Sequence, residues 1–89
     1  MNKIVLITTK GCDGCSIMKN AIYRAIHNSS KDIDFEIKDI SEIDTTEKRK
    51  LKLTDFPTTI FYKYNDIVRK EVGTRPYIII LRWIDIDFK

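Results

Sequence analysis

Two cysteines, three residues apart, are the residues of this chain whose spacing most clearly permits chemistry. They form the motif Cys12-Asp13-Gly14-Cys15, and the chain contains no other cysteine. Two thiols at this spacing can form a disulfide and exchange it with a disulfide of another molecule through a mixed-disulfide intermediate. The motif therefore predicts dithiol redox chemistry, provided that a strand precedes it and a helix begins at it.

A helix that begins at the motif would give the two cysteines different tasks. Cys12 would lie at the helix N-terminus, where unpaired backbone N–H groups and the helix dipole favour a thiolate. Cys15 would lie almost one turn further along the same helix face, close enough to bridge to Cys12. We therefore expect Cys12 to attack a partner disulfide and Cys15 to attack Cys12 and release the reduced partner.

A metal site is the main alternative for the cysteine pair. Tetrahedral zinc needs four ligands, and besides the two cysteines the chain offers one histidine, His27. Twelve residues of helix would place His27 about 18 Å from Cys15, so we interpret it as a surface residue or a helix C-terminal charge. Two chains that share their cysteine pairs around a metal or an iron–sulfur cluster remain an alternative, as does an inactive adaptor.

Length and composition predict one small domain. The chain has 89 residues, of which 43% are hydrophobic, enough for a single packed domain over residues 1–89. Its 16 basic and 13 acidic residues are mixed along the chain, whereas nucleic-acid-binding proteins usually concentrate basic residues on one face. No apolar run approaches the roughly 18 residues of a membrane span, and no signal-peptide pattern is present. We expect a cytoplasmic monomer that binds neither nucleic acid nor membrane.

The elements that must position the motif follow from the periodicity of the apolar residues. Strands are predicted over residues 3–8, 33–37, 58–63 and 67–72, and helices after Cys12, over residues 48–53 and from Pro76 onward. A capping box at residues 44–47 would begin the second helix. Thr74 can cap the third helix, with Pro76 in its first turn.

The order of these elements, β-α-β-α-β-β-α, indicates an α/β fold. We expect a four-stranded mixed sheet with helices on both faces. In this fold the two β-α-β connections would join parallel strands, and the closing hairpin would add antiparallel pairing.

With these elements in place, the sequence resembles the thioredoxin superfamily over nearly its whole length. The first half is glutaredoxin-like, because the first strand runs almost directly into the cysteine motif. The second half is thioredoxin-like: the segment from Phe56-Pro57 through residue 63 resembles the family's proline–threonine strand, and residues 67–73 resemble its closing strand. The resemblance implies that Pro57 follows a cis peptide bond and that Phe56, beside Cys12, pairs with the substrate backbone as with an added strand.

Three positions depart from the pattern of full thioredoxins. These proteins carry a tryptophan before the first cysteine and a proline before the second, and here the two positions are Gly11 and Gly14. A glycine before Cys15 is expected to loosen the turn and to change the redox potential. Thioredoxins also bury an aspartate six residues before the first cysteine, where this chain has Leu6.

Charges beside the first cysteine act in opposite directions. Asp13 places a negative charge next to Cys12, and a like charge disfavours the thiolate. Lys10 can offset that charge from the other side of the motif, or it can simply be exposed. The motif residues Gly11, Asp13 and Gly14 are expected to line the substrate site together with Phe56 and Pro57.

The segment after the last predicted strand bears on the electron donor. Glutaredoxins usually have paired glycines and an acidic or serine residue there, where glutathione is held, whereas this chain has Gly73-Thr74-Arg75. Thr74 and the helix amides can still bind a carboxylate, so glutathione stays an alternative donor. The resemblance implies a thiol–disulfide oxidoreductase without an organic cofactor. It would reduce disulfides of a client protein and take electrons from a reductase or from glutathione.

Overall fold

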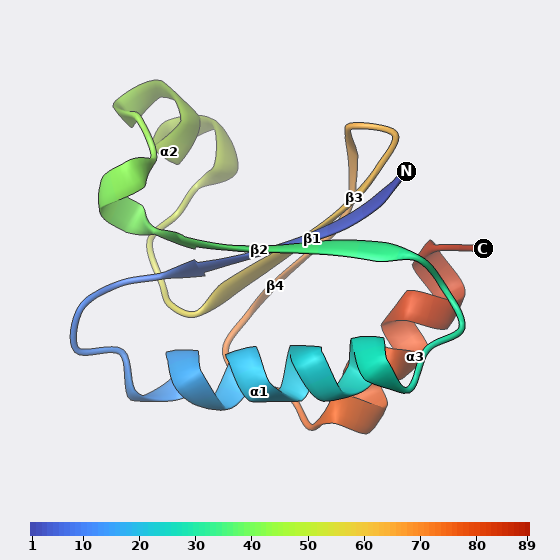
Figure 1. The fold of residues 1–89 in the computed structure, drawn as a ribbon. Coiled ribbons are helices and arrows are strands. Elements are labelled where there is room, and N and C mark those ends of the chain that lie inside the picture. Colours follow the sequence, from blue (N-terminus) through green and yellow to red (C-terminus); the bar gives the residue numbers. More distant parts are fainter.

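The computed structural model describes all 89 residues and confirms an α/β fold (Figure 1). One mixed sheet has the strand order β2-β1-β3-β4. The strands are β1 (Asn2–Thr8), β2 (Ile33–Asp39), β3 (Thr58–Lys63) and β4 (Asp66–Val72). The helices are α1 (Asp13–His27), α2 (Thr45–Leu51) and α3 (Tyr77–Asp87), and a short 3-10 helix, η1 (Ile40–Glu42), was not predicted. The element order is otherwise the predicted one.

The direction of β3 corrects the prediction that both β-α-β connections join parallel strands. β1 pairs in parallel with β2 but antiparallel with β3, which in turn pairs antiparallel with β4. The last residue of β2 lies beside Thr8, and the first residue of β3 lies beside Ile7, so β3 begins at the end of the sheet where β2 stops. A helix of seven residues is only about 10 Å long, too short to carry the chain back along the sheet.

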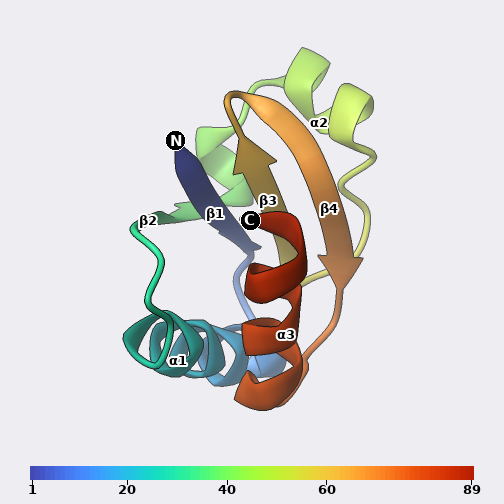
Figure 2. The ribbon, with the colours of Figure 1, turned by 90° about the vertical axis from the view of Figure 1, so that its right-hand side faces the viewer.

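Helices cover both faces of the sheet, as predicted. In Figures 1 and 2, α1 and α3 lie on one face and α2 lies on the other. Alternate residues of β1 divide between the two layers because successive strand side chains point to opposite faces. The larger core cluster, under α1 and α3, contains Ile4, Leu6, Met18, Ile22, Ala25, Phe61, Ile80, Ile84 and Phe88. The smaller cluster, under α2, contains Val5, Ile7, Leu51 and Ile60.

Side-chain caps begin or end several of these helices. Asn28 closes α1, and its Nδ2 donates to the carbonyl oxygen of Arg24 at 2.7 Å. The predicted cap of α2 is present in part, since the Asp44 carboxylate accepts from the N–H of Glu47. The reciprocal capping box occurs at η1 instead, between Asp39 and the residue three positions later.

The start of α3 corrects a second prediction. Thr74 is exposed and does not cap the helix, because the N-cap is Pro76, whose backbone is extended (φ −64°, ψ 152°). The carbonyl oxygen of Pro76 accepts the first helical hydrogen bonds, from the N–H groups of Ile79 and Ile80. Pro76 therefore precedes the first turn rather than lying within it.

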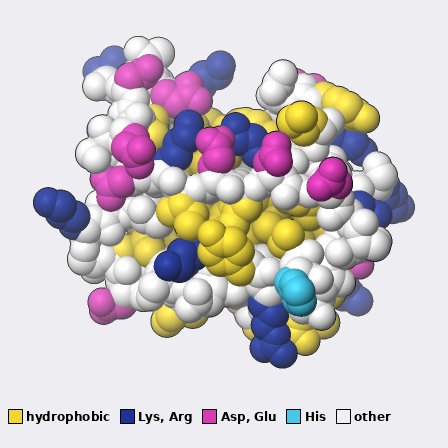
Figure 3. Space-filling model, viewed as in Figure 1, with side chains coloured by type: hydrophobic (Ala, Val, Ile, Leu, Met, Phe, Trp, Pro, Cys, Tyr) yellow, Lys and Arg dark blue, Asp and Glu magenta, His cyan; other side chains and the backbone are white.

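Hydrophobic side chains gather on the surface where α1 meets the edge strand β2 (Figure 3). Tyr23 of α1 packs edge-on against Phe35 of β2, with ring centroids 4.9 Å apart, and remains 54% exposed. No helix combines the length and apolar character that crossing a membrane requires.

Candidate active site

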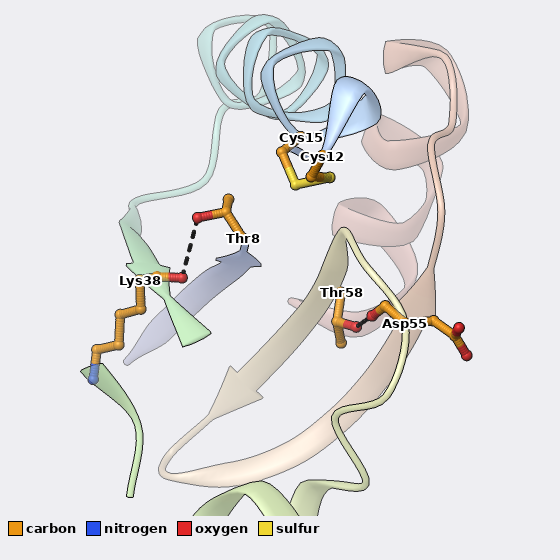
Figure 4. The surroundings of a disulfide bond; sticks show 6 residues. All are labelled: Thr8, Cys12, Cys15, Lys38, Asp55 and Thr58. Carbon is orange, nitrogen blue, oxygen red and sulfur yellow. Dashed lines mark hydrogen bonds between the residues drawn. A yellow bond between two sulfur atoms is a disulfide. The ribbon is translucent and has the colours of Figure 1, made fainter. Parts of the chain in front are cut away.

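The two cysteines form a disulfide at the start of α1 (Figure 4). Cys12 is the N-cap residue, with an extended backbone (φ −89°, ψ 100°), and its side chain caps no N–H group. The N–H of Cys15 donates to the carbonyl oxygen of Cys12 at 3.2 Å. Cys12 is half-buried, whereas Cys15 is only 8% exposed. The helix start thus makes Cys12 the more accessible of the two sulfurs.

A proline loop lies next to the disulfide. The peptide bond between Phe56 and Pro57 is cis, as the resemblance implies. Pro57 is buried, and its carbonyl oxygen accepts from the N–H of Gly73 at 2.8 Å. The hydroxyl of Thr58 donates to the carbonyl oxygen of Asp55 at 2.6 Å. One hydrogen bond therefore stabilises the loop internally, and the other anchors it to Gly73 at the end of β4.

Gly14 shows how closely three segments meet at the disulfide. A Cβ atom placed on Gly14 would lie 3.0 Å from Cγ2 of Thr74 and 3.4 Å from Cδ of Pro57. The motif, the proline loop and Thr74, two residues past β4, therefore touch, although they lie far apart in the sequence. Three of the predicted substrate-contacting residues come together here, next to Cys15.

Known structures resemble the fold of this chain. A thioredoxin-2 of the malaria parasite, described as a component of the parasite's protein secretion machinery, matches with a TM-score of 0.82 at 15% identity. This match covers 96% of the present chain and 82% of the other. The thioredoxin of Malassezia sympodialis matches with a TM-score of 0.78 at 16% identity, over 99% of this chain and 76% of that one.

The structure of a further malarial protein matches with a TM-score of 0.82 at 15% identity, over 100% of this chain and 99% of that one. The chain has the thioredoxin fold. No protein-family model and no curated protein sequence matches it. The thioredoxin fold together with a Cys12–Cys15 pair fits a redox function.

The sheet of this thioredoxin fold carries an unusual buried polar group. Leu6 of β1 is fully buried and lies opposite Thr59 of β3. Thr59 is also fully buried, and its Oγ1 has no hydrogen-bond partner. Thr59 was not among the residues predicted for the site; its one signal in the sequence is a second threonine at the start of an apolar strand.

The outer side of the motif is open to solvent. Gly11 has φ +73°, a left-handed conformation that glycine adopts at little cost, and nothing lies within 4 Å of a Cβ atom placed there. Asp13 is exposed in the first turn of α1, where the helix dipole favours a negative charge. Lys10 is exposed and lies near Asp39: hydrogen bonds from Ser41 lower the pKa of Asp39 most, and the charge of Lys10 lowers it further.

Arg75, which follows β4, interacts with neighbouring residues of its own segment. The guanidinium of Arg75 donates to the carbonyl oxygens of Val72 and Thr74 and lies 3.8 Å from the carboxylate of Glu71. The Thr74 side chain turns its methyl group toward Gly14. The arginine is therefore already engaged, as expected for a surface charge.

No group of three or more His, Cys, Asp and Glu side chains is arranged to hold a metal ion. His27 is exposed at the last residue of α1, so it lies at the opposite end of the helix from Cys12. A metal at the cysteines would need ligands from a second chain.

A hollow of about 370 Å³ lies on the α2 side of the sheet, lined by Val5, Ile7 and Leu51 among others, and neither cysteine contributes to it.

Proposed function

We propose that this protein is a thiol–disulfide oxidoreductase that reduces disulfides in a client protein. The observation that carries the proposal is the Cys12–Cys15 disulfide at the start of α1, with the more accessible sulfur at the helix N-terminus. Unpaired N–H groups at that position favour the thiolate that disulfide exchange requires. The thioredoxin fold and the adjacent proline loop support the same reaction.

The reaction proceeds in two exchanges. The Cys12 thiolate attacks one sulfur of the client disulfide, forms a mixed disulfide and displaces the other client sulfur as a thiolate. Cys15, after losing its proton, attacks the sulfur of Cys12. The Cys12–Cys15 disulfide forms, and the second client thiolate leaves. The client has then gained two electrons, and its two thiolates take up two protons.

The proline loop offers a place for the client backbone. The hydrogen bonds that anchor the loop use the carbonyls of Pro57 and Asp55, and the backbone of Phe56 takes no part in them. An extended client segment can therefore pair with Phe56 as an added strand. Gly14 and Thr74 would contact the same segment beside the disulfide, and Gly11 and Asp13 would border its outer side.

We also propose an electron donor, a location and an oligomeric state for the protein. The reaction as written needs no organic cofactor in the domain, and a reductase or glutathione would return two electrons and two protons to the disulfide. A single cysteine pair, rather than several structural bridges, supports a cytoplasmic location. The protein would act as a monomer on a client protein.

A redox titration tests this function directly. The protein is equilibrated in graded thiol–disulfide buffers, its free thiols are trapped with a maleimide, and the trapped thiols are counted by mass. We expect an intramolecular bridge with a midpoint between about −200 and −270 mV, the range of known reducing redoxins. If no bridge forms, or if the thiols stay blocked until a metal is removed, a metal-sharing module replaces the enzyme.

Two cysteine variants test the assigned roles. Cys12→Ser should abolish reduction of a fluorescent disulfide peptide, because the attacking thiolate is gone. Cys15→Ser should instead accumulate a stable mixed disulfide between Cys12 and the peptide, detectable as a mass increase that a reductant removes. A mixed disulfide trapped on Cys15 in the Cys12→Ser variant, and none on Cys12, would reverse the assignment.

A further inference from the structure

Thr59 is the one residue with a buried side-chain polar atom that lacks a hydrogen-bond partner. It is 0% exposed. A hydroxyl can both donate and accept, and leaving it unpaired away from water costs free energy, so nearly all buried polar groups are paired. The neighbouring Thr58 follows this rule, since its equally buried hydroxyl donates to the carbonyl oxygen of Asp55. The unpaired hydroxyl of Thr59 needs a physical explanation.

The alternation of β3 places the Thr59 side chain on the α1 face of the sheet. Ile60, the next residue, belongs to the cluster under α2, whereas Phe61 belongs to the cluster under α1 and α3. Side chains two apart on a strand share a face, so Thr59 points the same way as Phe61. Its partner across the sheet, Leu6, belongs to the same cluster as Phe61.

Thr59 lies close in the sequence to the proline that contacts the first turn of α1. It is the second residue of β3, two residues after Pro57. Pro57 in turn approaches Gly14 so closely that a Cβ atom there would lie 3.4 Å from the proline ring. Cys15 follows Gly14 and is the first buried residue of α1. The orphan hydroxyl therefore lies on the sheet face under α1, two residues from the proline that approaches the residue before Cys15.

The hydrogen-bonding needs of Cys15 change with its redox state. In the disulfide its sulfur carries no proton and donates nothing. When a dithiol reductant breaks the bridge, the protein takes up two electrons and two protons, and the reductant becomes a disulfide. Cys15 is then a buried residue that carries an S–H group.

We propose that Thr59 is the hydrogen-bond partner of the reduced Cys15, its Oγ1 accepting from the Cys15 S–H group. The hydroxyl is unpaired in the disulfide form because its partner exists only in the dithiol form. This inference deepens the proposed function and rests on it. Thr59 is thus a positioning residue that stabilises the reduced state relative to the oxidised state and makes the bridge easier to reduce.

Thr59→Val tests the proposal, because valine keeps the shape of threonine and removes the hydroxyl. Equilibration with dithiothreitol should show the thiol–disulfide equilibrium of the variant shifted toward the disulfide on the order of tenfold, which is about 30 mV more negative for a two-electron couple. Thr59→Ser keeps the hydroxyl and should restore the wild-type midpoint. An unchanged midpoint in Thr59→Val overturns the proposal.

Stability in each redox state supplies a readout that a merely structural hydroxyl would not give. Denaturant unfolding of the disulfide form should show Thr59→Val to be more stable than wild type, because the variant buries no unpaired group. The dithiol form should lack this gain. Equal gains in both forms would show that the hydroxyl has no redox-dependent partner and would overturn the proposal.

Thr58→Val is the matched control on the neighbouring position. Its hydroxyl bonds to the carbonyl oxygen of Asp55 rather than to a cysteine, so the variant should lose stability in both forms and keep its midpoint. If Thr59→Val does not fold, Thr59→Ser and Thr59→Ala make the same comparison, since they too differ only by the hydroxyl. The wild-type protein could show a redox midpoint in the expected range and still fail to reduce disulfide peptides. That result would refute the proposed function, and the midpoint of Thr59→Val would still test the hydrogen bond.

Discussion

At the residue scale, two identical side chains become different through their place on one helix. Cys12 is the N-cap and stays accessible, whereas Cys15 lies three residues on and turns into the buried layer. The difference comes from the helix geometry, since the N-cap residue lies outside the first turn and residues of that turn can face the core. The same geometry brings Gly14 against Thr74 and Pro57.

Gly14→Ala tests how closely the cysteine motif packs against Thr74. Alanine is favoured over glycine inside a helix by roughly 0.5–1 kcal/mol, but its Cβ would lie 3.0 Å from Cγ2 of Thr74. We expect this contact to cancel most or all of the gain in the free energy of unfolding, as measured by denaturant titration of the oxidised protein.

Thr74→Ser provides the control, because serine lacks the Cγ2 methyl group. In that background Gly14→Ala should recover the full gain, which gives a coupling free energy of about 0.5–1 kcal/mol between the two positions. Additive effects of the two substitutions would mean that the two segments do not press on each other in solution.

At the element scale, the connection from β2 to β3 decides how the proline loop reaches the motif. The connection holds only η1 and the short α2, so the chain re-enters the sheet at the end where the cysteines lie. η1 begins at Asp39, whose carboxylate accepts from both the N–H and the hydroxyl of Ser41. The N–H of Asp39 donates to the carboxylate of Glu42. This paired capping turns the chain sharply at the end of β2.

The cap at Asp39 predicts a dependence of stability on pH. Hydrogen bonds from Ser41 lower the pKa of Asp39 from its ordinary value of 3.8. A lowered pKa stabilises the fold above the ordinary value, and this contribution is lost as the pH falls through the folded-state value. The stability difference between wild type and Asp39→Asn should therefore shrink between about pH 5 and pH 2.

Asp85→Asn is the control for the loss of one negative charge, because Asp85 is exposed and makes no side-chain hydrogen bond or ion pair in the structure. Thermal unfolding of the three proteins across this pH range gives the comparison. A difference between wild type and Asp39→Asn that stays constant with pH would show that the carboxylate does not stabilise η1.

At the scale of the whole molecule, the two core clusters are built without the disulfide. Two apolar clusters, one on each face of the sheet, hold the helices in place, and neither includes a cysteine. Both cysteines can therefore change redox state while the two clusters stay packed. This independence suits the proposed redox function.

Reduction should therefore weaken the fold without unfolding it. A bridge that closes a loop of four residues stabilises a protein by about 2 kcal/mol through the entropy of the unfolded chain. We expect the reduced protein to unfold cooperatively with a stability lower by about that amount. Denaturant titrations with and without a reductant measure it, and the double variant Cys12→Ser/Cys15→Ser should match the reduced form. A reduced protein that lacks a cooperative transition would contradict this expectation.

The sequence by itself determined the features that depend on neighbours along the chain. Apolar, β-branched and alternating segments predicted the strands, the periodicity after Cys12 predicted α1, and the spacing of the two cysteines predicted the disulfide. These features are local because a strand or helix face repeats every two or three to four residues. The proline–threonine segment added the expectation of a cis bond at Pro57, which the structure confirms.

Only the tertiary structure decided the features that depend on how distant segments meet. The antiparallel direction of β3 follows from the short path through α2, and no local pattern encodes it. The contact between Gly14 and Thr74, and the isolation of the Thr59 hydroxyl, exist only once α1, β3 and the end of β4 are packed together. A polar atom is unpaired only when every surrounding group is in place, so its partner can be sought only in three dimensions.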